Sequence, residues 1–225
     1  MKKYLIIISA TVLLIAGYLI IGSNANKINA SATIVENTTN AKDGVTKPPD
    51  DDCCKALNEG NFSSESIYQL KSKWTDQNGR KIVLGKFKNK NVVLAMFYAS
   101  CQSACPVIVN NMKIIEAGIP RDKINNYRFV LVTIDPDRDT PANLLKYANE
   151  RNLNTNTWNL LRGTKDDIME LSMMFGFKFT KNESGGFSHT NLISFLNKSG
   201  EIIHQNAGLD VDINSVSNVL ASLNK

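Results

Sequence analysis

Hydrophobic residues are distributed unevenly along the chain, and the densest run lies near its start. Residues 4–21 read YLIIISATVLLIAGYLII, and no charged residue occurs between positions 4 and 26. These eighteen residues, rising about 1.5 Å each in a helix, would nearly span the roughly 30 Å core of a bilayer. Lys2 and Lys3 precede the run, and the positive-inside rule predicts that they stay in the cytoplasm while the rest is exported. We therefore expect residues 1–22 to be a transmembrane anchor.

The alternative for residues 1–22 is a signal peptide that is cleaved after export. Small residues at positions 23–25 and 30–32 fit a cleavage site. The apolar stretch of a signal peptide typically has about 7–15 residues, so the longer run here favours the anchor. Residues 23–60 are rich in Asn, Thr, Ser and Ala. Because they contain too few large apolar residues to offset the entropy of ordering, they are predicted to be a flexible linker.

From residue 61 onward the pattern becomes that of a folded domain, residues 61–225. Alternating apolar positions around a turn signal predict a β-hairpin over residues 67–84. Two continuous apolar runs, residues 91–98 and 128–134, are typical of strands buried on both faces, as in a parallel sheet. A shorter strand is expected over residues 158–161, and a second hairpin over residues 190–205.

Helix signals separate these predicted strands. Pro106 begins an apolar helical pattern that stops near Gly118, and Thr140 is expected to cap a second helix. Thr164, with Asp167 three residues later, predicts a capping box. A final amphipathic helix has Ile213, Val216, Leu220 and Leu223 on one face, and residues 178–188 are expected to form a loop. This order predicts an α/β, thioredoxin-like fold with an added N-terminal β-hairpin.

The charge of the chain excludes one class of partner. The formal net charge is +5, and two of those charges are Lys2 and Lys3, which leaves +3 on the remainder. No stripe of basic residues with interleaved aromatic residues is present in the sequence. We therefore expect no nucleic-acid partner.

Candidate chemistry is found where the first buried strand gives way to a helix. Cys101 and Cys105 are four residues apart at the carboxyl end of that strand, where open α/β sheets place their sites. The amino terminus of a helix stabilises thiolates, and positions four apart share a helix face, so both sulfurs could reach one ion. Two thiolates suit Cu(I) or Zn. An inert thiol pair or a structural disulfide remains possible on spacing alone.

These motifs resemble those of the Sco/SenC family of copper-delivery proteins. The resemblance covers residues 65–222 and is carried by Cys101-x-x-x-Cys105-Pro106, by the segment VTIDPDRDTP at residues 132–141, and by His189 before a strand-turn-strand. It implies a thioredoxin-like fold and one copper ion per chain, bound by Cys101, Cys105 and His189. It also implies a role in assembling the binuclear copper site of cytochrome c oxidase. The other histidine, His204, is interpreted as structural.

Two details qualify the resemblance. Residues 135–141 match a family motif, and we interpret them as a strand-to-helix turn held by pairing of Asp and Arg rather than as metal ligands. Many family members have Asp immediately before the histidine, whereas this chain has Ser188. That difference removes a charge that could tune the site.

Three classes of function stay open at this point. We expect a copper metallochaperone rather than an enzyme, in which His189 completes the site from a flexible loop and Gly185 and Gly186 let it swing away. Its implied partners are subunit II of cytochrome c oxidase or another cuproprotein, an upstream copper donor and a thiol reductant. The alternatives are an exported thiol–disulfide oxidoreductase and a copper or redox sensor. The usual oxidoreductase motif is CxxC, and the additional residue between Cys101 and Cys105 favours metal binding.

A second pair of cysteines, Cys53 and Cys54, lies in the predicted linker. Neighbouring Cα atoms are about 3.8 Å apart, whereas disulfides prefer about 5.5–6 Å, so a bond between these two residues would be strained. They could be exposed thiols without a function, or they could form a disulfide with another chain. Alternatively, they could relay copper or electrons to Cys101 and Cys105. The sequence leaves both interpretations open.

Overall fold

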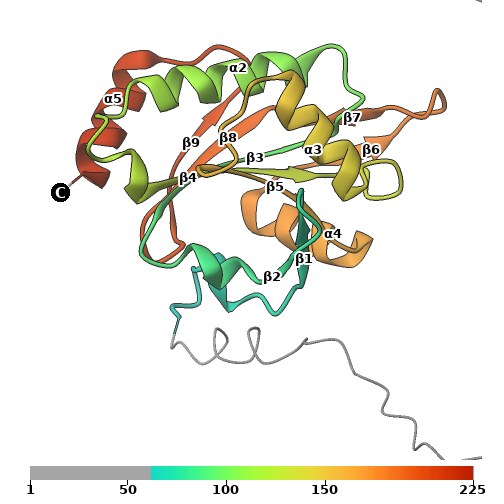
Figure 1. Cartoon of the computed structure of the whole chain (residues 1–225), viewed down its shortest axis with the longest axis horizontal. Helices are drawn as coiled ribbons and strands as arrows, with labels where there is room; N and C mark the ends of the chain where they lie inside the picture. The colour runs from blue at the N-terminus through green and yellow to red at the C-terminus, as the bar shows by residue number, and fades with distance from the viewer. Residues whose placement is uncertain (1–61, 225) are drawn as a thin grey trace, which may run out of the picture. The chain divides into compact units, whose positions relative to one another are not determined.

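A seven-stranded mixed sheet forms the centre of the part of the chain that the computed structural model describes, residues 62–224 (Figure 1). Its strand order is β2-β1-β5-β4-β3-β8-β9, and β6 pairs only with β7 in a separate two-stranded sheet. The strands are β1 (Trp74–Asp76), β2 (Lys81–Ile82), β3 (Asn91–Phe97), β4 (Tyr127–Thr133), β5 (Trp158–Arg162), β6 (Phe179–Lys181), β7 (Phe187–His189), β8 (Leu192–Leu196) and β9 (Ile202–Ala207).

The two long apolar runs form neighbouring parallel strands at the centre of this sheet. β3 pairs in parallel with β4, and β4 with β5, whereas β8 runs antiparallel to β3. All seven residues of β3 are buried. Burial on both faces explains why this strand reads as a continuous apolar run rather than as an alternating one.

Within residues 62–224, four helices cover the sheet, with α2, α3 and α5 on one face and α4 on the other (Figure 1). They are α2 (Ala104–Ala117), α3 (Pro141–Glu150), α4 (Lys165–Phe175) and α5 (Ile213–Leu223). The predicted starts of two helices are confirmed. The side chain of Thr140 accepts the N–H of Asn143, and Thr164 forms a reciprocal capping box with Asp167. Local sequence determines these ends because the capping partners are only three residues apart.

Three local predictions are wrong in detail. The expected hairpin over residues 67–84 has strands only at β1 and β2, and its first part is instead a 3-10 turn, Ile67–Gln69, in which the hydroxyl of Ser66 accepts the N–H of Tyr68. The helix after the cysteine segment starts at Ala104, two residues before Pro106. The expected loop over residues 178–188 contains β6 and most of β7.

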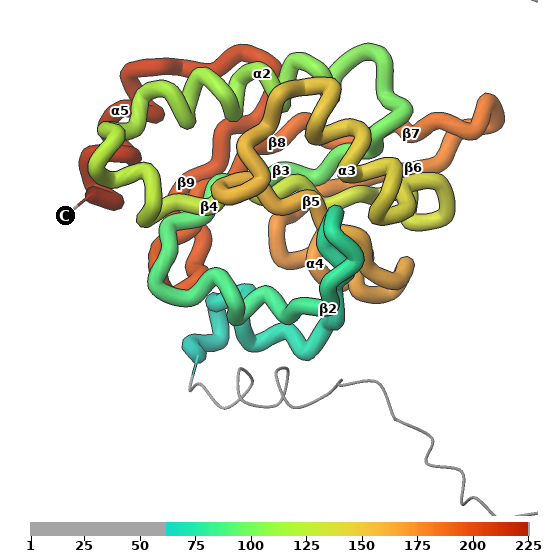
Figure 2. The backbone as a smooth tube through the Cα atoms, viewed as in Figure 1, coloured from blue at the N-terminus to red at the C-terminus, as the bar shows by residue number. Residues whose placement is uncertain are grey.

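In Figure 2 the β6–β7 hairpin projects beyond the end of the main sheet, beside the segment that joins β3 to α2. This hairpin carries His189 at the last position of β7. His189 is therefore held in a short strand, which differs from the flexible loop expected from the sequence.

Several sequence predictions concern residues outside the described part of the chain. The transmembrane anchor at residues 1–22, the linker at residues 23–60 and the cysteines Cys53 and Cys54 all lie there and stay predictions. Within residues 62–224, no helix combines the length and the apolar character needed to cross a bilayer.

Candidate metal centre

Sheet topology brings three distant segments to one edge. Because β3 and β4 are parallel neighbours, the segment after β3, which carries Cys101, and the turn after β4 lie at the same edge. β8 runs antiparallel to β3, so the amino-terminal end of β8 reaches that edge as well. His189 precedes β8 by three residues and so arrives beside the cysteines, although 84 residues separate it from Cys105.

The three residues predicted as ligands form one cluster. Their metal-binding atoms, two sulfurs and an imidazole nitrogen, all lie within 4.8 Å of one another. Sγ of Cys105 is 3.7 Å from Nε2 of His189. Both cysteines are buried free thiols, and His189 is half-buried. Two sulfur donors and one imidazole are a donor set that suits Cu(I), and the cluster is compact enough for all three to reach one ion.

The imidazole of His189 is oriented by its surroundings. Its Nδ1 lies 2.9 Å from the carbonyl oxygen of Thr190, which can only accept a hydrogen bond, so Nδ1 carries the proton. The ring stacks on Phe177 at 5.8 Å and 21° and meets Tyr98 edge-on at 5.9 Å. These contacts leave the lone pair of Nε2 facing the sulfurs, which is the arrangement that a metal-binding histidine requires.

The two thiols differ strongly in acidity. Burial raises the pKa of Cys101, but hydrogen bonds to its sulfur from the backbone N–H groups of Cys105 and Ser103 outweigh burial and lower that pKa to about 6. Burial raises the pKa of Cys105 to about 12, and the neighbouring Cys101 acts in the same direction. The thiolate expected from the helix terminus is therefore found on Cys101, whereas Cys105 keeps its proton at neutral pH.

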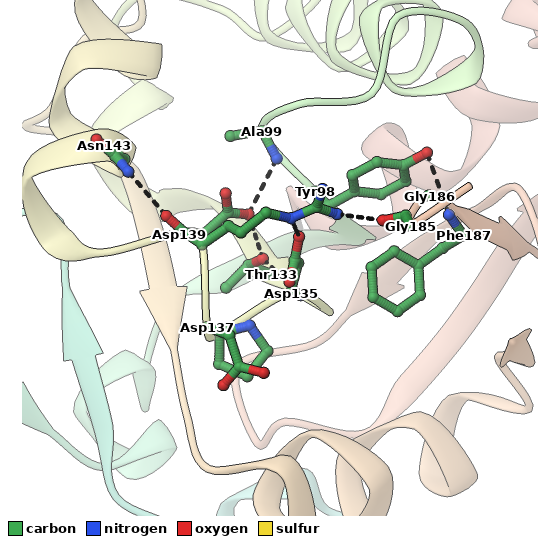
Figure 3. Close-up of polar contacts among 12 residues, drawn as sticks. Tyr98, Ala99, Thr133, Asp135, Asp137, Asp139, Asn143, Gly185, Gly186 and Phe187 are labelled. Atoms are coloured by element: carbon green, nitrogen blue, oxygen red, sulfur yellow. Dashed lines mark hydrogen bonds and ion pairs between the residues drawn. The ribbon is translucent and has the colours of Figure 1, made fainter. Parts of the chain in front are cut away.

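The turn at residues 135–141 supports the site without joining its ligands. Arg138 forms an ion pair with Asp135, as the sequence predicted. The buried carboxylate of Asp139 accepts hydrogen bonds from the hydroxyl of Thr133 and from the N–H of Ala99 (Figure 3). None of these carboxylates belongs to the cluster of possible metal ligands found among residues 62–224.

Two side chains at the site were not identified from the sequence. Tyr98 ends the apolar run of β3, and Phe177 follows the left-handed residue Gly176 that terminates α4, so both read as ordinary core residues. The second histidine lies elsewhere, since the ring of His204 packs against Phe195. Ser188 is exposed on β7, and because strand residues alternate in direction its side chain points away from the side that His189 occupies.

Comparison with known proteins identifies similar sequences and structures. The sequence profile described as SCO1/SenC matches residues 64–223. A SCO1 protein homolog of Bacillus subtilis is 23% identical over 103 residues, which are 46% of this chain and 53% of that protein. The chain thus matches only about half the length of that relative.

Solved structures share the fold. A SCO1/SenC family lipoprotein of Bacillus anthracis superposes with a TM-score of 0.64 and 24% identity over 73% of this chain and 99% of that chain. Copper-bound ScoI of Bradyrhizobium japonicum superposes with a TM-score of 0.57 and 20% identity over 68% of this chain and 96% of that chain. The predicted thioredoxin-like α/β fold is therefore confirmed for the described residues.

Proposed function

The chain belongs to the SCO1/SenC family, and we propose that it is an exported metallochaperone that binds one copper ion through Cys101, Cys105 and His189 and passes it on. The observation that carries this proposal is the cluster of two thiols and one imidazole within 4.8 Å. Copper is then the cargo of the protein. The copper bound to the relative from Bradyrhizobium japonicum agrees with this assignment.

The two cysteines would differ in protonation when the copper ion arrives. Cys101 offers a thiolate at neutral pH, whereas Cys105 must lose its proton when the ion arrives. His189 would contribute the lone pair of Nε2, because its Nδ1 donates to the carbonyl oxygen of Thr190. Both sulfurs belong to buried residues, which lowers the polarity around them.

A second candidate function, thiol–disulfide exchange, is favoured by the acidity difference between the cysteines. The Cys101 thiolate would attack one sulfur of a partner disulfide, and the other partner sulfur would leave as a thiolate. Cys105 would then lose its proton and attack the mixed disulfide, which releases the second partner thiolate and closes a Cys101–Cys105 disulfide. A closed disulfide offers no thiolate donors, so copper binding and this exchange exclude each other.

The delivery target that we propose is the binuclear copper site of cytochrome c oxidase subunit II, or another cuproprotein. The support is the family resemblance of residues 65–222 and the exported position predicted for the domain. An upstream copper donor and a thiol reductant are needed in either case, because only the reduced cysteine pair can take up copper.

Copper stoichiometry and insulin reduction by the reduced full chain would test the function. We expect about one copper per chain, loss of binding in Cys101→Ala and Cys105→Ala, and weaker binding with an altered Cu(II) spectrum in His189→Ala. His204→Ala is the matched control, since it removes the other of the two histidines. Stoichiometric copper in the double cysteine variant would refute the site. Vigorous insulin reduction without copper binding would favour the oxidoreductase.

The exported position is tested separately. A phosphatase fused after residue 60 should be active, and the protein should fractionate with membranes. Recovery of a soluble form that starts near residue 26 or 33 would identify cleavage in place of an anchor.

A further inference from the structure

Two neighbouring residues in the turn after β4 contact the two segments that carry the ligands. Asp139 accepts the N–H of Ala99 at 3.0 Å, two residues before Cys101. Nη2 of Arg138 donates to the carbonyl oxygen of Gly185 at 2.7 Å, four residues before His189. The turn thus contacts both the cysteine segment and the β6–β7 hairpin.

The β6–β7 hairpin depends on contacts outside itself. Its strands have three residues each and pair with no other strand. An isolated two-stranded hairpin is only marginally stable in water. At its base, the N–H of Thr190 donates to the carbonyl of Lys178 at 2.8 Å. This hydrogen bond fixes only the base of the hairpin. The orientation of its far part, residues 182–187, depends on contacts with side chains of the domain.

Two groups hold the far part of the hairpin against the domain. The hydroxyl of Tyr98 accepts the N–H of Phe187 at a long 3.5 Å, and the two rings pack with centroids 5.3 Å apart. Nη2 of Arg138 donates to the carbonyl oxygen of Gly185 at 2.7 Å. Nε of Arg138 is fixed by its ion pair with Asp135, whose side chain is 4% exposed. The planar guanidinium can therefore hold both partners at once, which a lysine ammonium at this position cannot do in the same geometry.

We propose that Arg138 is a positioning residue that fixes the β6–β7 hairpin and thereby keeps Nε2 of His189 beside the sulfurs. The inference rests on the proposed copper function, because Arg138 would act on the rate at which His189, the third ligand, leaves the copper ion. Loss of the contact with Gly185 weakens the hold on the far part of the hairpin, which Tyr98 still contacts, and His189 would then leave a bound copper ion more often. Arg138 would thus set how readily copper is handed over.

Copper release to a chelator from the reduced full chain tests this proposal. We expect Arg138→Gln to accelerate release about tenfold, as expected when one charge-assisted hydrogen bond is lost. Arg138→Lys should behave like Arg138→Gln, since it keeps the charge but cannot bind both partners. Arg80→Gln is the matched control: Arg80 also pairs through Nε with a buried carboxylate, that of Asp76 at 2.8 Å, but in the β1–β2 turn. It should leave release unchanged.

A positioning role is separated from general destabilisation by the His189→Ala background. Without the imidazole, Arg138→Gln should add nothing to the release rate. An equal acceleration with and without His189 would overturn the proposal, as would wild-type release from Arg138→Lys.

Hydrogen exchange of the copper-free chain gives a readout that does not depend on metal. The N–H of Asn182, which donates to Gly186 within the hairpin at 2.9 Å, should exchange about tenfold faster in Arg138→Gln, as expected when one charge-assisted hydrogen bond is lost. Amides of the buried strand β4 should be unaffected. Faster exchange in a chain that binds no copper would support the positioning role and refute the proposed function. Normal exchange and normal release in a chain that binds copper would refute the positioning role alone.

Discussion

The difference in acidity between Cys101 and Cys105 is the property of the site that can be tested most directly. The pKa of Cys101 is lowered from 9.0 to about 6, which corresponds to about 4 kcal/mol in favour of the thiolate. The pKa of Cys105 is raised to about 12. At pH 7 Cys101 is then mostly thiolate, whereas Cys105 is almost wholly protonated.

The physical source of this difference is the start of α2. Two backbone N–H groups, those of Cys105 and Ser103, donate to Sγ of Cys101, and the hydroxyl of Ser103 lies 3.8 Å from the same sulfur. Hydrogen bonds to a charged group contribute about 1.5–3 kcal/mol each, so the backbone donors alone can outweigh the cost of burial. The long contact of the hydroxyl should contribute about 1 kcal/mol or less.

The perturbation that follows is Ser103→Ala, which removes the hydroxyl and keeps the backbone. We expect the pKa of Cys101 to rise toward its ordinary value, with about a fivefold fall in its acid dissociation constant for a loss of about 1 kcal/mol. The assay is the pH dependence of alkylation by iodoacetamide in the reduced, copper-free chain, with each cysteine followed by peptide mass spectrometry. Ser100→Ala, which alters an exposed serine on the other side of Cys101, is the control.

Two results would refute this reasoning. In the wild-type chain, alkylation of Cys101 with a midpoint near pH 9 would mean that the backbone donors do not stabilise its thiolate. Faster alkylation of Cys105 than of Cys101 at pH 7 would mean that the roles of the two sulfurs are reversed.

Three further outcomes follow from the structure. Copper binding should release about one cysteine proton at pH 8, from Cys105, and a further one from Cys101 as the pH falls below about 6; affinity that does not rise with pH would contradict this. Gly200→Ala should cost about 2–4 kcal/mol in denaturant unfolding, because a Cβ would lie 2.7 Å from the ring of Tyr68 at a φ of +80°. Gly79→Ala, at a φ of +78° but in open space, should cost about 1 kcal/mol, and equal losses would refute the steric argument. Thr164→Ala should cost about 1 kcal/mol by the same measurement, whereas an unchanged stability would mean that the cap is not needed.

Sequence patterns determined those features of this protein that depend on near neighbours. Continuous apolar runs predicted β3 and β4 because burial on both faces favours apolar residues at consecutive positions. Thr164 and Asp167 predicted the start of α4 because a capping box closes within one turn. The spacing of Cys101 and Cys105 was sufficient to suggest a site. Their partner, His189, was identified only through the family resemblance.

Tertiary structure decided the features that depend on contacts between distant segments. His189 reaches the sulfurs because β8 lies antiparallel beside β3, a pairing that no local pattern encodes. The strands β6 and β7 were read as a loop because three-residue strands carry almost no periodic signal. They form here because their contacts with the domain, including that of Arg138 with Gly185, offset the cost of ordering them. The acidity of Cys101 and Cys105 differs for the same reason, since burial and donor geometry act through space and not along the chain.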